Sequence, residues 1–137
     1  MIPKGVLMKR DHCRDYATQA FVWFGAVRNK SVEEFIVEEG IDAVEYEDFC
    51  ADLFAVAETL FELAATDREY IIDAVREVYM CSRKFPGHDD IACRVRHHAF
   101  IVPATEKTVY KWLETARDIF AAKRGLTVKI PPGFEQI

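Results

Sequence analysis

Residues 90–113 read DIACRVRHHAFIVPATEKTVYKWL, and this stretch decides what kind of fold the chain adopts. The carboxylate of either Asp89 or Asp90 can accept from the free amides at the start of a helix, and Pro103 ends that helix because proline cannot continue it. Thr105 is a second capping residue, placed directly before another helical repeat. The first helix should bury Ile91, Val95 and Ala99. The second should bury Val109, Trp112, Leu113, Ala116, Ile119 and Phe120, with Trp112 mostly covered by the first helix.

The same helical periodicity covers the earlier part of the chain. Apolar residues recur at steps of three and four over residues 14–29, which predicts an amphipathic helix there. Ser31 and Glu34 form a capping box, and Gly40 is a stop for the helix that follows. A long acidic helix should then cover residues 42–65. Its expected inner face comprises Phe49, Leu53, Val56, Leu60, Phe61 and Ala64.

Three further signals complete the expected order of elements. Asp67 should cap the next helix, and Gly125 should end the last one. Residues 126–130 alternate like a short strand or an extended arm. We therefore expect an all-α fold, a bundle of about six helices with a C-terminal helix-turn-helix.

The composition fits a helical domain of this size. Half of the 137 residues are hydrophobic and 12% are aromatic, so the chain can bury a core and is not disordered. No apolar run reaches the roughly 18–20 residues that cross a bilayer, so we expect no contact with a membrane. The first ten residues break into charges before the apolar core of a secretory signal forms. These observations indicate a cytoplasmic protein with reduced cysteines.

The formal net charge of −5 is unevenly distributed along the chain. Residues 1–72 carry 15 acidic against 7 basic side chains, whereas residues 73–137 carry 8 against 11. Such asymmetry indicates that one part meets a polyanion and the other has a different task. We expect an acidic helical bundle over 1–80, which could dimerise or dock a partner. A helix-turn-helix DNA-binding part with a C-terminal arm should cover 81–137.

The segment from about residue 89 to residue 126 resembles the helix-turn-helix of phage-type transcription regulators. In these sigma-region-4-like and ArpU-type late-gene regulators, a stretch like Thr-x-x-Thr-Val-Tyr-x-Trp-Leu-x-x-Ala-Arg opens the recognition helix, and the corresponding stretch here begins at Thr105. Ile91 and Thr105 lie further apart than in a compact motif, so the first helix or the turn should be extended. The resemblance implies a sequence-specific transcription regulator of a phage or mobile element, bound to double-stranded DNA as a homodimer.

The expected DNA contacts follow from the faces of these two helices. Polar and basic side chains on the first two turns of the second helix should project away from its apolar stripe and enter the major groove. Neighbouring basic residues should neutralise phosphates. The expected contacts are Lys84, Arg94, Arg96, Lys107, Thr108, Tyr110 and Lys111.

Metal and enzyme chemistry have little support in the sequence. Cys81, His88, Cys93 and His97 could in principle share a zinc ion, but no closely spaced Cys-x₂₋₄-Cys pair is present. Nucleophile-elbow, P-loop, dinucleotide and His-Glu-x-x-His motifs are also lacking. We therefore expect no bound metal, no cofactor and no enzyme activity.

The acidic residues of the first half leave a second function open. They could be the solvated faces of two helices, or they could dock a basic partner. In the second case the chain would be a small acidic inhibitor or adaptor, for example a phage anti-defence protein that acts on a nucleic-acid enzyme. Aromatic residues beside the acidic run are core candidates that could also serve a dimer interface, namely Phe21, Trp23, Phe24 and Phe35.

Overall fold

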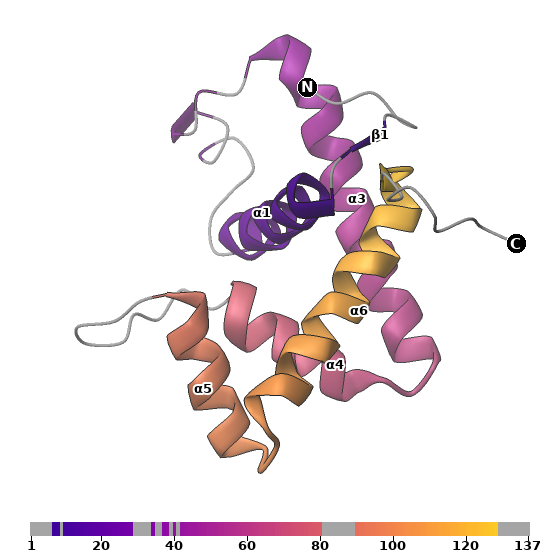
Figure 1. Ribbon diagram of the computed structural model, residues 1–137. Helices are drawn as coiled ribbons and strands as arrows, with labels where there is room; N and C mark the ends of the chain where they lie inside the picture. The colour runs from indigo at the N-terminus through magenta and orange to yellow at the C-terminus, as the bar shows by residue number, and fades with distance from the viewer. Residues whose placement is uncertain are drawn as a thin grey trace, which may run out of the picture.

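The computed structural model describes residues 7–8, 10–28, 34, 37–38, 40, 42–80 and 90–128. In chain order, the elements are β1 (Leu7–Met8), α1 (Arg10–Arg28), α3 (Ala43–Ala65), α4 (Glu69–Val75), η1 (Arg76–Met80), α5 (Ile91–Ile101), α6 (Glu106–Arg124) and β2 (Thr127–Val128). The π-helical turn η1 continues α4, so the described part contains five helices (Figure 1). The all-α prediction is confirmed, whereas the helix expected before Gly40 lies mostly outside the described residues.

Four helix ends lie where the sequence predicts them. Asp42 accepts from the Glu45 amide at 2.8 Å, and Asp90 accepts from the Cys93 amide at 2.7 Å. Thr105 caps α6 by accepting from the Thr108 amide at 3.1 Å. Gly125 ends α6 in the left-handed region, with φ of 79°, where a side chain would be disfavoured.

Asp67 does not cap α4, so that prediction is wrong. Its φ of 59° is left-handed, and its amide donates to the Ala64 carbonyl at 3.2 Å. The Arg68 amide donates to the Leu63 carbonyl at 2.8 Å. These two bonds form a Schellman motif, which closes the C-terminus of α3. Asp67 therefore ends one helix instead of beginning the next, because aspartate tolerates the left-handed conformation that the reversal requires.

One hydrophobic core joins all the described helices. Phe21 of α1 has no exposed surface, and its ring lies 5.8 Å from that of Tyr79 and 5.7 Å from that of Phe120. Long α6 packs along α3 and also contacts α1, α4 and α5 (Figure 1). The core cluster therefore contains residues from both expected parts, 1–80 and 81–137.

The first helix crosses η1 at a glycine. A Cβ atom on Gly25 would lie 2.6 Å from Cα and 2.9 Å from the carbonyl oxygen of Met80. Both contacts are with backbone, so no side-chain rotation could relieve them. The close packing of α1 on η1 therefore depends on the missing side chain at Gly25.

The buried face of α3 differs in part from the expected one. Phe61 is 77% exposed and Ala64 is also exposed, whereas Asp52 and Thr59 are buried. A purely hydrophobic pattern does not assign Asp52 and Thr59 to the core. Both can be buried because each forms a hydrogen bond inside the protein. Thr59 donates to the Ala55 carbonyl at 2.7 Å, and Asp52 binds side chains from two other helices.

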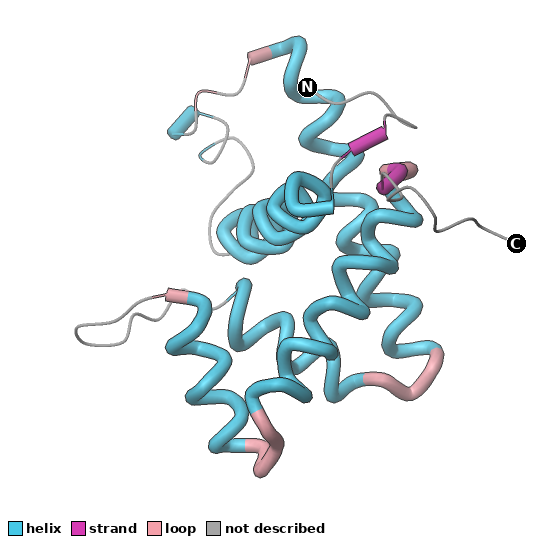
Figure 2. Tube along the Cα trace, viewed as in Figure 1, coloured by secondary structure: helices cyan, strands magenta, loops and turns pink. Residues whose placement is uncertain are grey.

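Two short strands bring the described ends of the chain together. Leu7 lies opposite Thr127, and Met8 lies opposite Val128, in a parallel pair (Figure 2). The expected strand after residue 125 is confirmed for Thr127–Val128, but nothing in the sequence indicated its partner. None of the helices in the described part is both long and apolar enough to cross a membrane.

Candidate functional site

The helices after residue 68 form a three-helix unit. The α4–η1 segment, α5 and α6 each pack on the other two, and residues 102–105 connect α5 to α6. Two hydrogen bonds close this connection: the Val102 amide donates to His98 at 3.0 Å, and the Ala104 amide donates to Ala99 at 2.9 Å. A connection of about 3–4 residues is typical of a helix-turn-helix. The extra spacing noted in the sequence is taken up by α5, which runs from Ile91 to Ile101.

The first two turns of α6 present the side chains that the sequence placed there. Lys107, Tyr110 and Lys111 are exposed, while Val109 and Leu113 on the opposite face are fully buried. Thr108 is half-buried, and its hydroxyl lies 2.8 Å from that of Thr105. That pair adds a side-chain bond to the Thr105 cap at the start of the helix.

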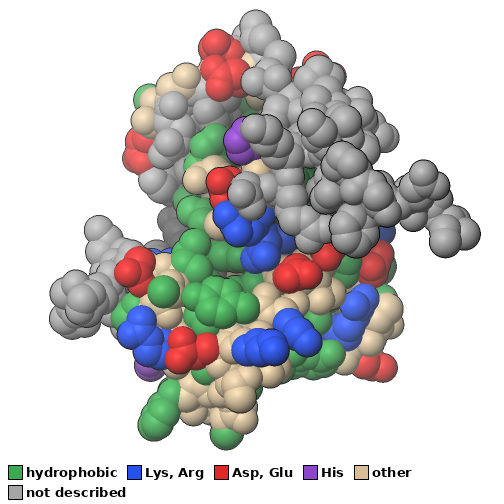
Figure 3. All heavy atoms as spheres, viewed as in Figure 1, with side chains coloured by type: hydrophobic (Ala, Val, Ile, Leu, Met, Phe, Trp, Pro, Cys, Tyr) green, Lys and Arg blue, Asp and Glu red, His purple; other side chains and the backbone are tan. Residues whose placement is uncertain are grey.

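The charge on this surface is mixed. Glu106, Glu114 and Asp118 are also exposed on α6. On the face of the molecule seen in Figure 3, basic and acidic side chains lie side by side over the lower helices. Basic side chains therefore occur in the first two turns of α6, at its C-terminal end, and in its middle at half-buried Arg117, which donates to the Tyr79 hydroxyl at 2.8 Å.

The remaining expected contacts have different surroundings. Arg96 is exposed on α5. Arg94 is half-buried, and its Nη1 donates to the Val78 carbonyl at 3.1 Å, where a cation is favourable at the end of η1. This guanidinium braces η1 against α5. Lys84 lies outside the described residues.

Trp112 is only partly covered, and its ring neighbour is not on the expected helix. Its ring meets that of Tyr70 on α4 edge-on, with 5.2 Å between the centroids. Ile91, which should have helped to cover it, is itself 39% exposed. Val95 and Ala99 are buried as predicted. The middle of α6 therefore packs against both α4 and α5, and Trp112 lies on the side that faces α4.

A buried histidine lies at the end of α5. His98 is 4% exposed, and its Nε2 atom has no hydrogen-bond partner among the described residues. Burial lowers the pKa of His98, against the opposing effect of the carboxylates of Glu77 and Asp73. The imidazole is therefore neutral at pH 7 and forms part of the core within the three-helix unit.

A buried polar cluster links α1, α3 and α6. The Nε of Arg124 donates to Asp52 at 2.7 Å, and its Nη2 donates to Asp48 at 3.0 Å. The hydroxyl of Tyr16 donates to the same Asp52 carboxylate at 2.8 Å. Burial raises the pKa of Asp52, although Arg124 and Tyr16 both oppose that shift. These groups bind one another, so the cluster is a cross-brace between helices.

Sequence reasoning missed this cross-brace. The sequence places Arg124 in the last turn of α6, where a solvated cation is common, and Asp52 within the acidic run. The available signal was the position of Asp52, which falls on the same face of α3 as Phe49 and Val56.

Two further observations concern metal ligands and known proteins. Within the described ranges, no three His, Cys, Asp or Glu side chains are placed to hold a metal ion. Cys93 is half-buried and His97 exposed, while Cys81 and His88 lie outside those ranges. Comparisons with protein-family models, with curated proteins and with solved structures found no match for this chain.

Proposed function

We propose that this chain is a sequence-specific DNA-binding transcription regulator that inserts the first two turns of α6 into the major groove. The observation that carries the proposal is the short, hydrogen-bonded connection after α5, which places Lys107, Tyr110 and Lys111 on the outside while Val109 and Leu113 anchor the helix. A helix-turn-helix reads bases with the N-terminal residues of its second helix. The resemblance to phage-type regulators supports a source in a phage or mobile element.

The side chains divide between reading bases and holding phosphates. Lys107 and Lys111 can bind phosphates or guanine edges, and the Tyr110 hydroxyl can bond with either. Arg96 is exposed on α5 and would bind a flanking phosphate, the role that Lys84 would share. Arg94 contributes through η1, because its Nη1 is already bonded to Val78.

A second candidate is a small acidic inhibitor or adaptor that binds a basic protein. The exposed acids Asp42, Glu45 and Glu47 at the start of α3 favour it, together with the net charge of −5. Such a protein has no reason to bind random duplex DNA. Salt-dependent duplex binding therefore separates the two candidates.

The test is fluorescence anisotropy with a labelled duplex at several salt concentrations. The parent should bind, with an affinity that falls as salt rises. The double variant Lys107→Ala/Lys111→Ala should bind more weakly, and the slope of log K against log salt should fall by about 1.8, because each lost phosphate contact removes about 0.9. Its circular dichroism melting curve should match that of the parent, because both side chains are exposed.

Lys123→Ala is the matched control, because Lys123 lies at the far end of the same helix and pairs with Glu62 at 2.9 Å. It should bind duplex like the parent. Equal affinity of the double variant and the parent at every salt concentration would refute the assignment of α6. A parent without duplex binding would favour the adaptor.

A further inference from the structure

The outer face of α3 carries a long apolar stripe. Tyr46, Phe54 and Phe61 are 46%, 67% and 77% exposed. Four small residues complete the stripe, and all are exposed: Cys50, Ala57, Ala64 and Ala65. At 3.6 residues per turn, these seven positions fall within an arc of about 100° and extend along about 28 Å of helix. The stripe is therefore continuous from the first turn of α3 to the last.

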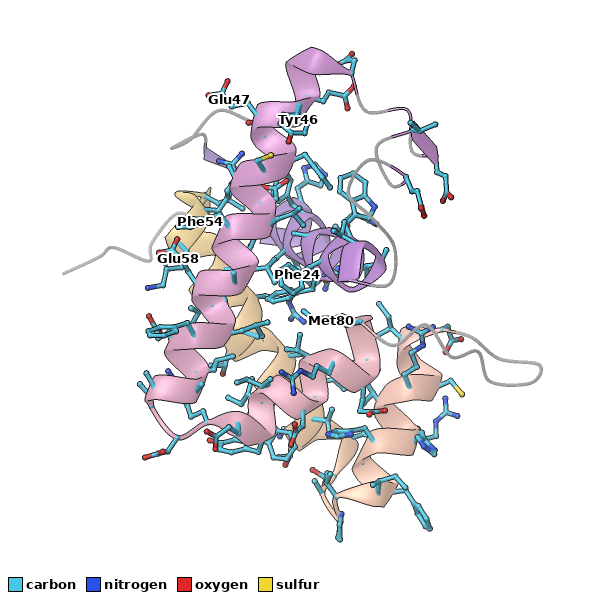
Figure 4. The ribbon with its side chains drawn as sticks, turned by 180° about the vertical axis from the view of Figure 1, so that it is seen from behind. Phe24, Tyr46, Glu47, Phe54, Glu58 and Met80 are labelled. Atoms are coloured by element: carbon cyan, nitrogen blue, oxygen red, sulfur yellow. The ribbon has the colours of Figure 1, made fainter. Side chains whose placement is uncertain are left out.

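The opposite face of α3 is already part of the core. Phe49, Val56 and Leu63 are buried there against the other helices. In Figure 4, α3 lies in front of the bundle, with Phe54 and Glu58 on one side of it and Phe24 and Met80 on the other. A helix that is apolar on two opposite faces is normally covered on both. A contiguous exposed patch of this kind marks an interaction site.

The order of large and small residues along the stripe identifies the occupant. Two α3 helices can be placed side by side and antiparallel, with a two-fold axis midway between residues 55 and 56. Each aromatic residue of the stripe then faces a small residue of the other helix. Tyr46 falls opposite Ala65, Phe54 opposite Ala57, and Phe61 opposite Cys50. Facing positions that alternate large and small side chains interdigitate without voids. We propose that α3 packs antiparallel against α3 of a second copy of this chain, about a two-fold axis at this midpoint.

The charges beside the stripe favour the same orientation. The N-terminal end of α3 exposes Glu45 and Glu47. At the C-terminal end, Arg68 and Lys123 lie beside Glu62, at 3.8 and 2.9 Å. Asp67 and Glu69 are exposed at the same end, so its charge is mixed, whereas the N-terminal end is acidic. An antiparallel pair places the acidic end of each helix beside the mixed end of its partner, whereas a parallel pair would bring the two acidic ends together. The interface is isologous, as in most closed dimers, and it does not depend on DNA binding.

The first test measures the mass in solution by sedimentation velocity. The parent should sediment at about twice the chain mass of 15.8 kDa at micromolar concentrations. Phe54→Ser/Phe61→Ser should sediment as a monomer and keep its helical circular dichroism, because neither ring is in the core of the single chain. Phe100→Ser is the matched control, because Phe100 is 84% exposed on α5, away from the stripe. It should remain a dimer.

The second test measures the register by disulfide formation. Phe61→Cys places a thiol opposite Cys50 of the second copy, so mild oxidation should give a covalent dimer that Cys50→Ser abolishes. Tyr46→Cys faces Ala65 of the second copy, so the same oxidation should give little covalent dimer. A monomeric parent, or a dimer that survives Phe54→Ser/Phe61→Ser but not Phe100→Ser, would overturn the proposal. Efficient cross-linking of Cys50 to itself in the parent would show a parallel pair or an antiparallel pair in another register, and either would overturn the proposal.

Discussion

Replacing Arg124 with methionine should be one of the most damaging single changes in the described core. The substitution keeps the apolar stem and removes the guanidinium that pairs with Asp52 at 2.7 Å. The Arg124 side chain is 7% exposed and that of Asp52 is 10% exposed, so the carboxylate would remain buried without its counter-ion. Breaking a buried pair in this way typically costs about 3–5 kcal/mol.

The lower end of that range applies here. Tyr16 still donates to Asp52 at 2.8 Å in the variant, so the carboxylate keeps one hydrogen bond. We therefore expect a loss of about 3 kcal/mol in the free energy of unfolding. For a chain of this length, each kcal/mol lowers the melting temperature by about 3–4 °C, which predicts a fall of about 10 °C.

The same reasoning predicts how the loss varies with pH. The pKa of Asp52 is already raised by burial, and removing Arg124 raises it further. A carboxyl with a raised pKa in the folded state regains stability as the pH falls and the group takes up a proton. The difference in unfolding free energy between Arg124→Met and the parent should therefore shrink between pH 7 and pH 5.

Urea unfolding followed by circular dichroism at both pH values measures these quantities. The triple variant Tyr16→Phe/Asp52→Leu/Arg124→Met removes the three most buried groups of the cluster and leaves Asp48, whose side chain is 27% exposed and can be solvated. It should regain most of the lost stability, because an apolar replacement of a buried pair is often neutral. Lys123→Met, on the surface beside it, should change the urea midpoint little. A loss below about 1 kcal/mol in Arg124→Met, or one that grows as the pH falls, would refute the reasoning.

Three further predictions concern the packing of the other helices. Gly25→Ala should lower the free energy of unfolding by about 1–2 kcal/mol, as measured in urea, because its Cβ would lie 2.6 Å from Met80 Cα. This loss should exceed the roughly 1 kcal/mol by which alanine favours a helix. A gain in stability would contradict this contact. Burial lowers the pKa of His98, so the unfolded chain takes up this proton first as the pH falls below about 6.5, and the parent loses stability. The drop in melting temperature from pH 7 to pH 5 should therefore be smaller in His98→Leu than in the parent. An equal drop would argue against a buried neutral imidazole. Trp112→Ala should lower the melting temperature through a loss of about 2–3 kcal/mol, since its ring is partly buried against Tyr70; loss of duplex binding at an unchanged melting temperature would instead identify Trp112 as a surface contact.

The sequence by itself determined the helical class and several helix ends. Asp42, Asp90 and Thr105 each accept from the amide three residues further on, so the signal and its target lie within one turn. Gly125 ends α6 through its own backbone conformation. Lys107 and Lys111 were also placed correctly on the outside of α6, because a strong apolar stripe fixes which face is buried.

Only the tertiary structure decided how the helices meet. Asp52 and Arg124 are 72 positions apart, and their pairing requires α6 to cross α3 at one level. The outer aromatic residues of α3 have the same composition as a core face, so the pattern alone assigned Phe61 to the inside. Trp112 likewise meets α4 because α6 is shared by two neighbours. Capping bonds form within a single turn and are therefore fixed by local sequence, whereas the face that a two-sided helix buries depends on which other helices it packs against.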